Sequence, residues 1–169
     1  MSKKAGGRKQ HERADGLTVV ASNRRARHDY EILDTLEVGM VLKGAEVKSL
    51  RTSKVTIADS YVRIDDGELW VLGLHVAPYE HAASWPLEPE RKRKLLAHRD
   101  EIDRWQARAD QERLTIVPLK LYFREGRAKL ELGLARGRKT IDKRQAIAQR
   151  TADREAAREI ARARRQPAD

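Results

Sequence analysis

Apolar residues recur at close to every second position between residues 30 and 42, in the stretch YEILDTLEVGMVL. This alternation is typical of a β-strand with one face buried. We expect the strand to end at Gly44. The segment EVKSL that follows is expected to continue as the next extended piece.

Two later segments carry the pattern of β-hairpins. They run over residues 60–79 and 114–135, and each alternates apolar and polar positions around a central acidic-glycine pair, Asp66–Gly67 and Glu125–Gly126. Glycine adopts the positive φ that a tight turn needs, so these pairs predict the two turns.

Two prolines refine the hairpins. Pro78 is expected to end the second strand of the first hairpin. Pro118 lies inside the second hairpin, and because proline cannot donate a ladder hydrogen bond it predicts an edge strand or a bulge there.

The spacing of apolar residues changes between the two hairpins. From Pro89 to about Glu112 the sequence is charged, and Leu95, Ile102, Trp105 and Ala109 fall on one helical stripe. We expect one inserted helix that covers an open end or face of the sheet.

Around six short strands with one inserted helix predict a mainly β fold, an OB-like antiparallel β-barrel that closes its edges by curling on itself. A hairpin-rich sandwich stays open, because strand order cannot be read from spacing. The length of 169 residues is that of one domain with tails. All eight aromatic residues lie in the central body.

Positive charge is segregated at the two ends of the chain. Residues 136–165 hold 11 Lys or Arg against 4 Asp or Glu, residues 1–16 hold 5 against 2, and residues 17–135 hold 20 against 19. Solubility alone does not require such segregation, whereas a polyanionic partner favours it.

Charge and composition divide the chain into three parts. A basic, disordered arm is expected over 1–16, the barrel over 17–139 and a basic tail, disordered or helical, over 140–169. The tail is rich in helix-forming residues, but its only large apolar side chains are Ile141, Ile147 and Ile160.

Several classes of protein are disfavoured by what the sequence lacks. It has no cysteine for disulfides or thiolate sites, no apolar run for a signal peptide or membrane span, and no pair of its five histidines has the i,i+4 spacing of a metal pair. We expect a cytoplasmic protein that is not an enzyme and has no metal, cofactor, membrane or small-molecule substrate.

Nucleic-acid binding has more support, because cationic segments bind phosphates largely independently of sequence. We expect the strand aromatics Trp70, Tyr122 and Phe123 to be core, and Tyr79 and Trp85 to be exposed candidates for base stacking. The residues alone indicate a basic RNA- or DNA-binding barrel. A general single-stranded nucleic-acid-binding barrel, a ribosomal structural protein and, least favoured, an RNA-processing enzyme remain alternatives.

Seven ordered blocks add a more specific indication: NRRARHDYEI, GAEVKSLR, DSYVRIDDGELWVLGLHVAPY, RKRKLLAHRDEI, LTIVPLKLYF, KLELGLARGRK and DKR. They resemble the signature blocks of the bacterial SsrA-binding protein (small protein B) family, from about Asn23 to Arg144. The resemblance implies an OB-like barrel that binds the tRNA-like domain of transfer-messenger RNA. It also implies delivery of that RNA to stalled ribosomes, with a tail that is unstructured in free solution and helical in the empty mRNA channel.

The resemblance also assigns residues. The implied RNA-binding residues are Asn23, Arg24, Arg27, His28, Glu37, Leu96, Lys129, Arg138 and Lys139. The implied contacts to the decoding centre and mRNA channel of the ribosome, through rRNA of the small subunit, are Asp142, Lys143, Arg144 and Ile160. Three alternatives stay open: Leu96 as a core residue, Glu37 as a strand-face carboxylate paired with a neighbouring arginine, and residues 142–144 as the ordinary first turn of a solvated helix.

Overall fold

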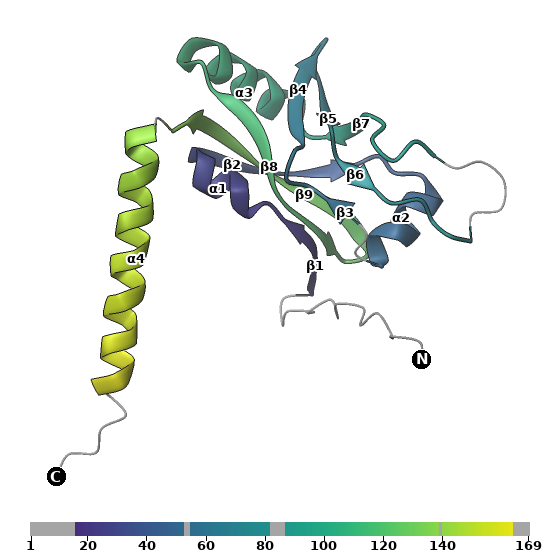
Figure 1. The fold of residues 1–169 in the computed structure, drawn as a ribbon. Helices are drawn as coiled ribbons and strands as arrows, with labels where there is room; N and C mark the ends of the chain where they lie inside the picture. The colour runs from purple at the N-terminus through teal and green to yellow at the C-terminus, as the bar shows by residue number, and fades with distance from the viewer. Residues whose placement is uncertain (1–15, 53–54, 82–86, 139, 164–169) are drawn as a thin grey trace, which may run out of the picture.

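The fold is a strongly curved β-sheet with small helices at its rim and one long helix that projects from it (Figure 1). The computed structural model describes residues 16–52, 55–81, 87–138 and 140–163, except for the side chains of 140–143. The strands are β1 (Leu17–Ser22), β2 (Tyr30–Met40), β3 (Val55–Thr56), β4 (Tyr61–Asp65), β5 (Glu68–Leu72), β6 (His75–Val76), β7 (Arg93–Leu96), β8 (Thr115–Arg124) and β9 (Arg127–Gly137). The helices are α1 (Arg24–Asp29), α2 (Gly44–Arg51), α3 (Arg99–Glu112) and α4 (Thr140–Ala163).

The main sheet closes on itself. Its strand order is β1-β8-β4-β5-β7-β2-β9, and β9 also pairs with β8, so the six strands from β8 to β9 form a closed ring. β1 lies outside this ring and pairs with the second half of β8, from Lys120 to Arg124. Every pairing is antiparallel. The predicted mainly β, OB-like barrel is therefore confirmed, and the sandwich alternative does not apply.

The interior of the ring is aliphatic, and α3 closes one end of it. Leu121, Leu130 and Leu132 are fully buried inside the sheet. Ile102 and Trp105 from α3 pack onto the same core, as the helical stripe predicted. This helix hides apolar surface that an open barrel end exposes to water.

Both predicted hairpin turns are present. Asp66 and Gly67 have φ of 50° and 72°, and Glu125 and Gly126 have 50° and 75°, as a two-residue turn with two positive φ angles requires. The register of β8 against β9 shifts just after Pro118, so the bulge that this proline predicted is confirmed.

The expectation of an extended EVKSL segment was wrong, because these residues lie in α2. The Glu46 side chain reaches back to accept a hydrogen bond from the Lys43 backbone N–H at 2.9 Å, which caps the helix start. Glu46, Ser49 and Leu50 are buried on one face. Their spacing is helical, and the sequence reading took it for an extended run.

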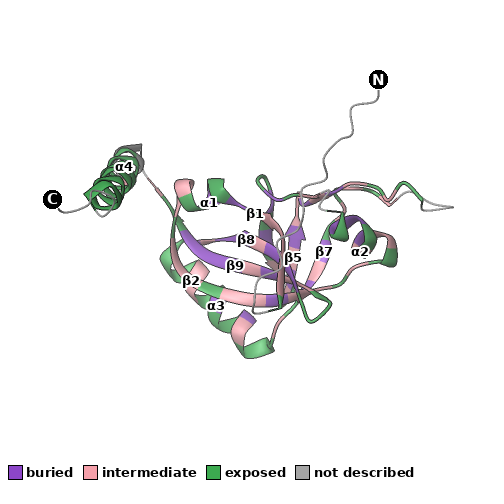
Figure 2. Cartoon of the chain, turned by 90° about the horizontal axis from the view of Figure 1, so that it is seen from below, coloured by how far each residue is buried: buried purple, intermediate pink, exposed green. Residues whose placement is uncertain are grey.

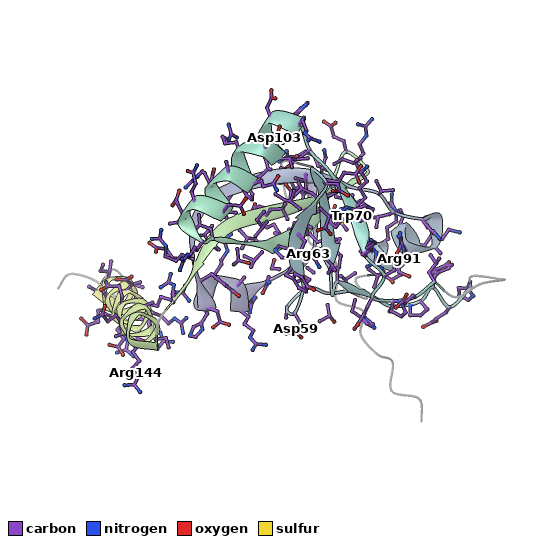
Figure 3. All side chains as sticks on the ribbon, turned by 90° about the horizontal axis from the view of Figure 1, so that it is seen from above. Asp59, Arg63, Trp70, Arg91, Asp103 and Arg144 are labelled. Carbon is purple, nitrogen blue, oxygen red and sulfur yellow. The ribbon has the colours of Figure 1, made fainter. Side chains whose placement is uncertain are left out.

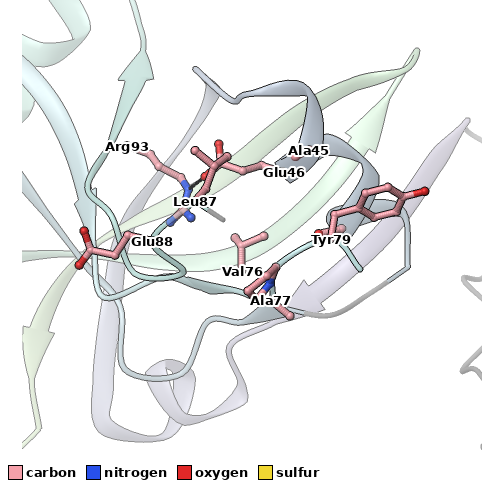
Figure 4. A pocket seen from close by; sticks show the side chains of 10 residues that line it. Ala45, Glu46, Val76, Ala77, Tyr79, Leu87, Glu88 and Arg93 are labelled. Carbon is pink, nitrogen blue, oxygen red and sulfur yellow. Dashed lines mark hydrogen bonds and ion pairs between the residues drawn. The ribbon is translucent and has the colours of Figure 1, made fainter. Parts of the chain in front are cut away.

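A buried ion cluster anchors α2 to the segment that leads into β7 (Figure 4). Arg93 is 1% exposed and Glu46 4% exposed, and Arg93 Nε donates to Glu46 Oε1 at 2.8 Å. Arg91 Nε donates to the same oxygen at 2.8 Å. The remaining nitrogens of Arg93 donate to the carbonyls of Leu74 and Pro89. One guanidinium thereby holds together three segments distant in sequence.

The predicted helix from Pro89 was also partly wrong, because it begins only at Arg99. Residues 93–96 form β7, which fills the ring between β5 and β2. Leu95, which we expected on the helix stripe, instead pairs with Leu69 and points into the core. The backbone N–H and C=O groups of β5 and β2 need hydrogen-bond partners at this place in the ring, and β7 supplies them. This requirement outweighs the helical spacing of the apolar residues in the segment.

The first hairpin ends earlier than Pro78 indicated. Its second strand, β5, ends at Leu72, and Gly73 follows with φ of 70°. A Cβ at Gly73 is placed 3.0 Å from the Asp59 carbonyl oxygen, so glycine permits a close approach there. The chain then enters β6, which pairs with β3.

The tail forms α4, a helix that is exposed along almost all of its described length (Figure 2). It contacts α1, where Arg150 Nη2 donates to the Arg27 carbonyl oxygen at 2.9 Å. Ile147 and Ile160 are exposed, consistent with the expected lack of an apolar docking face. That the tail is disordered in free solution stays a prediction. No described helix is both long and apolar enough to cross a membrane.

Candidate RNA interface

Three of the predicted RNA-binding residues lie on one outward strip of the barrel. Gly39 of β2 pairs with Leu96 on β7 and with Lys129 on β9, and residues directly opposite in a sheet share a face. Glu37 lies two residues before Gly39, on the same face. We call these four residues, Glu37, Gly39, Leu96 and Lys129, the strip.

Leu96 is exposed, which answers one open alternative. Its side chain is 53% accessible, whereas its neighbour Leu95 is buried. A leucine exposed to water at one edge of the strip is free to pack against a ligand. The reading of Leu96 as core therefore does not apply.

A groove with a volume of about 390 Å³ borders the strip, and Met40, Leu42, Val47 and Phe123 form much of its wall. Gly39, Leu96 and Lys129 line it, and a Cβ placed on Gly39 meets Leu96 Cβ at 3.5 Å. The missing side chain at Gly39 leaves the floor of the groove open, and a ligand approaches the backbone closely where a strand has glycine. The groove combines an apolar wall with a cation.

Glu37 is held by two side chains of β8. The Tyr122 hydroxyl donates to Glu37 Oε2, and Arg124 Nη1 lies 2.7 Å from the same oxygen. Glu37 is thus a strand-face carboxylate paired with an arginine, as the second alternative stated. Because both contacts use Oε2, Oε1 has no protein partner among the described residues and is available to a donor from a ligand.

Tyr122 is buried beneath this carboxylate. Burial, together with its hydrogen bond to Glu37, raises the pKa of the Tyr122 hydroxyl above its usual value. The hydroxyl is therefore protonated near neutral pH and donates to Glu37. Lys129 is the direct cross-strand neighbour of Tyr122, so both charged members of the strip lie next to this tyrosine.

Asn23 has a structural function at the start of α1. It is 4% exposed, its Oδ1 accepts from the Ala26 N–H at 3.0 Å, and its Nδ2 donates to the Pro118 carbonyl at 3.0 Å. The side chain caps α1 and fixes it to the bulge of β8. Any contribution of Asn23 to RNA binding acts through the position of α1.

The other predicted residues of α1 present cations and a histidine at the surface. Arg24 is exposed. Arg27 Nη2 lies 3.3 Å from Glu131 Oε1, and Glu131 is the cross-strand neighbour of Glu37, so α1 adjoins the strip. His28 Nδ1 lies 2.9 Å from Asp29 Oδ1.

Arg138 lies where the barrel meets α4. Its backbone N–H donates to the Asp29 carbonyl at 3.0 Å. With Arg136 and Gln145 it lines a polar cleft of about 560 Å³ between the end of β9 and the first turns of α4. Lys139 lies outside the described residues.

The predicted ribosome contacts all belong to α4. Asp142 and Lys143 lie in its first turn, and their side chains are outside the described part of the chain. Arg144 and Ile160 are both exposed. The structure does not bring these residues to the strip, so the chain presents two separate surfaces.

Comparison with known proteins adds the decisive observation: a family model described as SmpB protein matches residues 20–162. The chain belongs to the SmpB protein family. An SsrA-binding protein of Solidesulfovibrio magneticus is 50% identical over 147 residues, which cover 87% of this chain and 96% of the relative. An SsrA-binding protein of Desulforudis audaxviator is 52% identical over 140 residues, covering 83% and 92%.

A solved structure agrees with the SmpB assignment. It is described as "tmRNA-SmpB: a journey to the center of the bacterial ribosome", and one of its chains superposes with a TM-score of 0.61 at 52% identity. The superposition covers 75% of this chain and 93% of that chain.

Sequence reasoning missed three residues of the candidate interface of this SmpB family member. Tyr122 and Arg124 hold Glu37, and Gly39 forms the groove floor. A glycine inside a strand pattern is the one signal available beforehand, since it marks a bulge or a close approach. The Tyr122–Glu37 bond joins residues 85 apart in sequence, and no local pattern indicates it.

Proposed function

We propose that this chain binds the tRNA-like domain of transfer-messenger RNA (tmRNA) and delivers it to stalled ribosomes, so that trans-translation tags the nascent chain and frees the ribosome. The observation that carries the proposal is the SmpB family match over residues 20–162. The description of the superposed structure names tmRNA and the bacterial ribosome. The chain acts by binding in the bacterial cytoplasm, without catalysis, cofactor, small-molecule substrate or membrane.

The strip supports the RNA-binding part of the proposal. Lys129 neutralises a phosphate, Glu37 Oε1 accepts from a base or a sugar hydroxyl, and Leu96 packs on an unstacked base. Single-stranded loops of a folded RNA present phosphates, sugar hydroxyls and unstacked bases close together. Arg24, Arg27, His28, Arg138 and Lys139 add contacts beside the strip.

The tail supports the ribosome-binding part. α4 is exposed, basic and separate from the strip. A helix of this composition suits a channel lined by rRNA phosphates, because cations rather than apolar side chains supply its affinity. Asp142, Lys143 and Arg144 enter near the decoding centre, and Ile160 is the apolar anchor deeper in the mRNA channel.

Capture from a bacterial lysate tests the proposed function. The tagged full-length chain is expected to enrich one structured RNA with a tRNA-like end. Indiscriminate RNA, or constant association with translating ribosomes, would instead identify a general nucleic-acid binder or a ribosomal structural protein.

Lys129→Ala and Glu37→Ala are each expected to weaken tmRNA binding about tenfold or more. A hydrogen bond to a charged group contributes roughly 1.5–3 kcal/mol, and about 1.4 kcal/mol is a factor of ten. Gel-shift titration measures the effect, with circular dichroism to verify folding. Arg104→Ala, which removes an exposed cation from α3, is the control and should bind like the unaltered chain. Full affinity in a folded Lys129→Ala or Glu37→Ala variant would remove that residue from the site.

Tyr122→Phe is expected to weaken tmRNA binding by about three- to tenfold, because Glu37 loses one of the two groups that position it. The change removes a single oxygen and leaves the ring in place. The diagnostic measurement is a double-mutant cycle: Tyr122→Phe should have no further effect on binding once Glu37→Ala is present. Additive losses would show that Tyr122 affects RNA binding independently of Glu37.

A further inference from the structure

The outer face of β4 and β5 carries a tryptophan that does not belong to the barrel core. Leu69 and Val71 of β5 are buried inside the ring, so Trp70 between them points outward. It is half-buried, and the expectation that Trp70 is core was wrong. Its cross-strand neighbours are Arg63 on β4 and Lys94 on β7, and Figure 3 shows Arg63 and Trp70 together on this face.

Most charges on this face are already paired. Arg63 Nη2 lies 3.1 Å from Asp65 Oδ1, and Lys94 Nζ contacts Glu68. Lys92 differs, because its Nζ lies 4.8 Å from the centre of the Trp70 ring and has no carboxylate partner among the described residues. The indole face holds this ammonium by a cation–π interaction without neutralising it.

Lys92 continues the strip. Leu96 and Lys94 are successive outward positions of β7, and Lys92 is the next one, immediately before the strand begins. At a rise of roughly 3.3 Å per residue, the Cα atoms of Lys92 and Leu96 are about 13 Å apart. An RNA strand seated in the groove at Leu96 reaches Lys92 within a few nucleotides.

We propose that Lys92, positioned by Trp70, extends the RNA-binding surface from the groove across β7 and β5. The ligand group is a phosphate of the same RNA strand that contacts Leu96 and Lys129. Trp70 is a positioning residue, which keeps the Lys92 side chain extended over the sheet so that less conformational entropy is lost on binding. The inference rests on the proposed function, since it assumes an RNA strand in the groove.

Salt dependence of binding tests the inference. Lys92→Ala in the full chain should reduce the slope of log affinity against log salt concentration by about 0.7–0.9, the loss expected for one phosphate contact. Arg104→Ala removes the same charge from α3 and should leave the slope unchanged. The probe is a transcribed tRNA-like domain of tmRNA, titrated between low and physiological salt.

The role of Trp70 is tested by two substitutions. Trp70→Phe keeps an aromatic face and should retain most of the affinity, whereas Trp70→Leu removes it and should weaken binding. In the double variant Trp70→Leu/Lys92→Ala the loss should be smaller than the sum of the two single losses, because both act through one ammonium. An additive loss would overturn the positioning role of Trp70.

Lys129→Ala, measured in parallel, separates this inference from the proposed function. If Lys129→Ala weakens binding while Lys92→Ala changes neither affinity nor slope, the extended surface is wrong and the proposed function stands. If neither variant differs from the unaltered chain, the extended surface is wrong and Lys129 is not part of the site. The proposed function itself fails only if the unaltered chain does not bind the tRNA-like domain.

Discussion

Truncation after Lys139 is expected to abolish tagging of stalled nascent chains while leaving tmRNA binding nearly intact. The physical reason is the separation of the two surfaces: the strip lies on β2, β7 and β9, and the truncation removes only α4. The Arg150 hydrogen bond to the Arg27 carbonyl is exposed to solvent, and a typical hydrogen bond contributes only roughly 0.5–1.5 kcal/mol to stability. The barrel keeps its closed ring and its core without the tail.

A reconstituted translation system programmed with a message lacking a stop codon measures tagging, and gel shift measures RNA binding. The matched control is a full-length chain carrying Arg104→Ala, which changes charge but keeps α4. Tagging at the normal rate by the truncated chain would show that α4 is dispensable. Loss of RNA binding would show that the strip is not sufficient.

The barrel was predictable where short-range chemistry decides the structure. Asp66–Gly67 and Glu125–Gly126 mark turns because few other dipeptides adopt two positive φ angles, and Pro118 marks a bulge because it lacks an N–H. The cationic tail was readable from composition alone. These signals lie within a few residues of the features they indicate.

The predictions that were wrong concern segments whose structure depends on contacts with residues distant in sequence. β7 is a strand because it fills the position between β5 and β2 in the ring. No local pattern within residues 89–98 indicates that position. Trp70 points outward because Leu69 and Val71 fill the interior. A strand pattern specifies alternation but not which of two apolar sets faces the core, and Trp70 was assigned to the wrong set.

The candidate site was predictable to a similar degree. Resemblance to the family placed Glu37, Leu96 and Lys129, and the structure brings all three to one strip. Their supporting residues were not predictable, because Tyr122 and Arg124 reach Glu37 across strands whose register no sequence pattern sets. Asn23 matched the same family block as Arg24, yet only the structure shows that it is buried.

Glu46→Gln is expected to destabilise the barrel by about 3–5 kcal/mol, the loss typical of breaking a buried ion pair by removing one partner. Arg93 is then left as a buried cation whose carboxylate is gone, while it still holds the carbonyls of Leu74 and Pro89. Chemical denaturation measures the loss. Glu68→Gln is the matched control, because it breaks the solvent-exposed pair with Lys94 and should cost at most about 1 kcal/mol.

The pH dependence of stability provides a second test of the same cluster. Burial alone raises the pKa of Glu46, but hydrogen bonds from Arg91, the Lys43 backbone and Arg93 outweigh it, so the pKa lies below the usual 4.5. The folded chain therefore holds the Glu46 carboxylate ionised more tightly than the unfolded chain does. Its contribution to stability is complete above about pH 4.5 and is lost as the pH falls through the lower folded value. Glu46→Gln should flatten the fall in melting temperature over that acid range. An equally steep fall in the Glu46→Gln variant would place the acid sensitivity in other carboxylates.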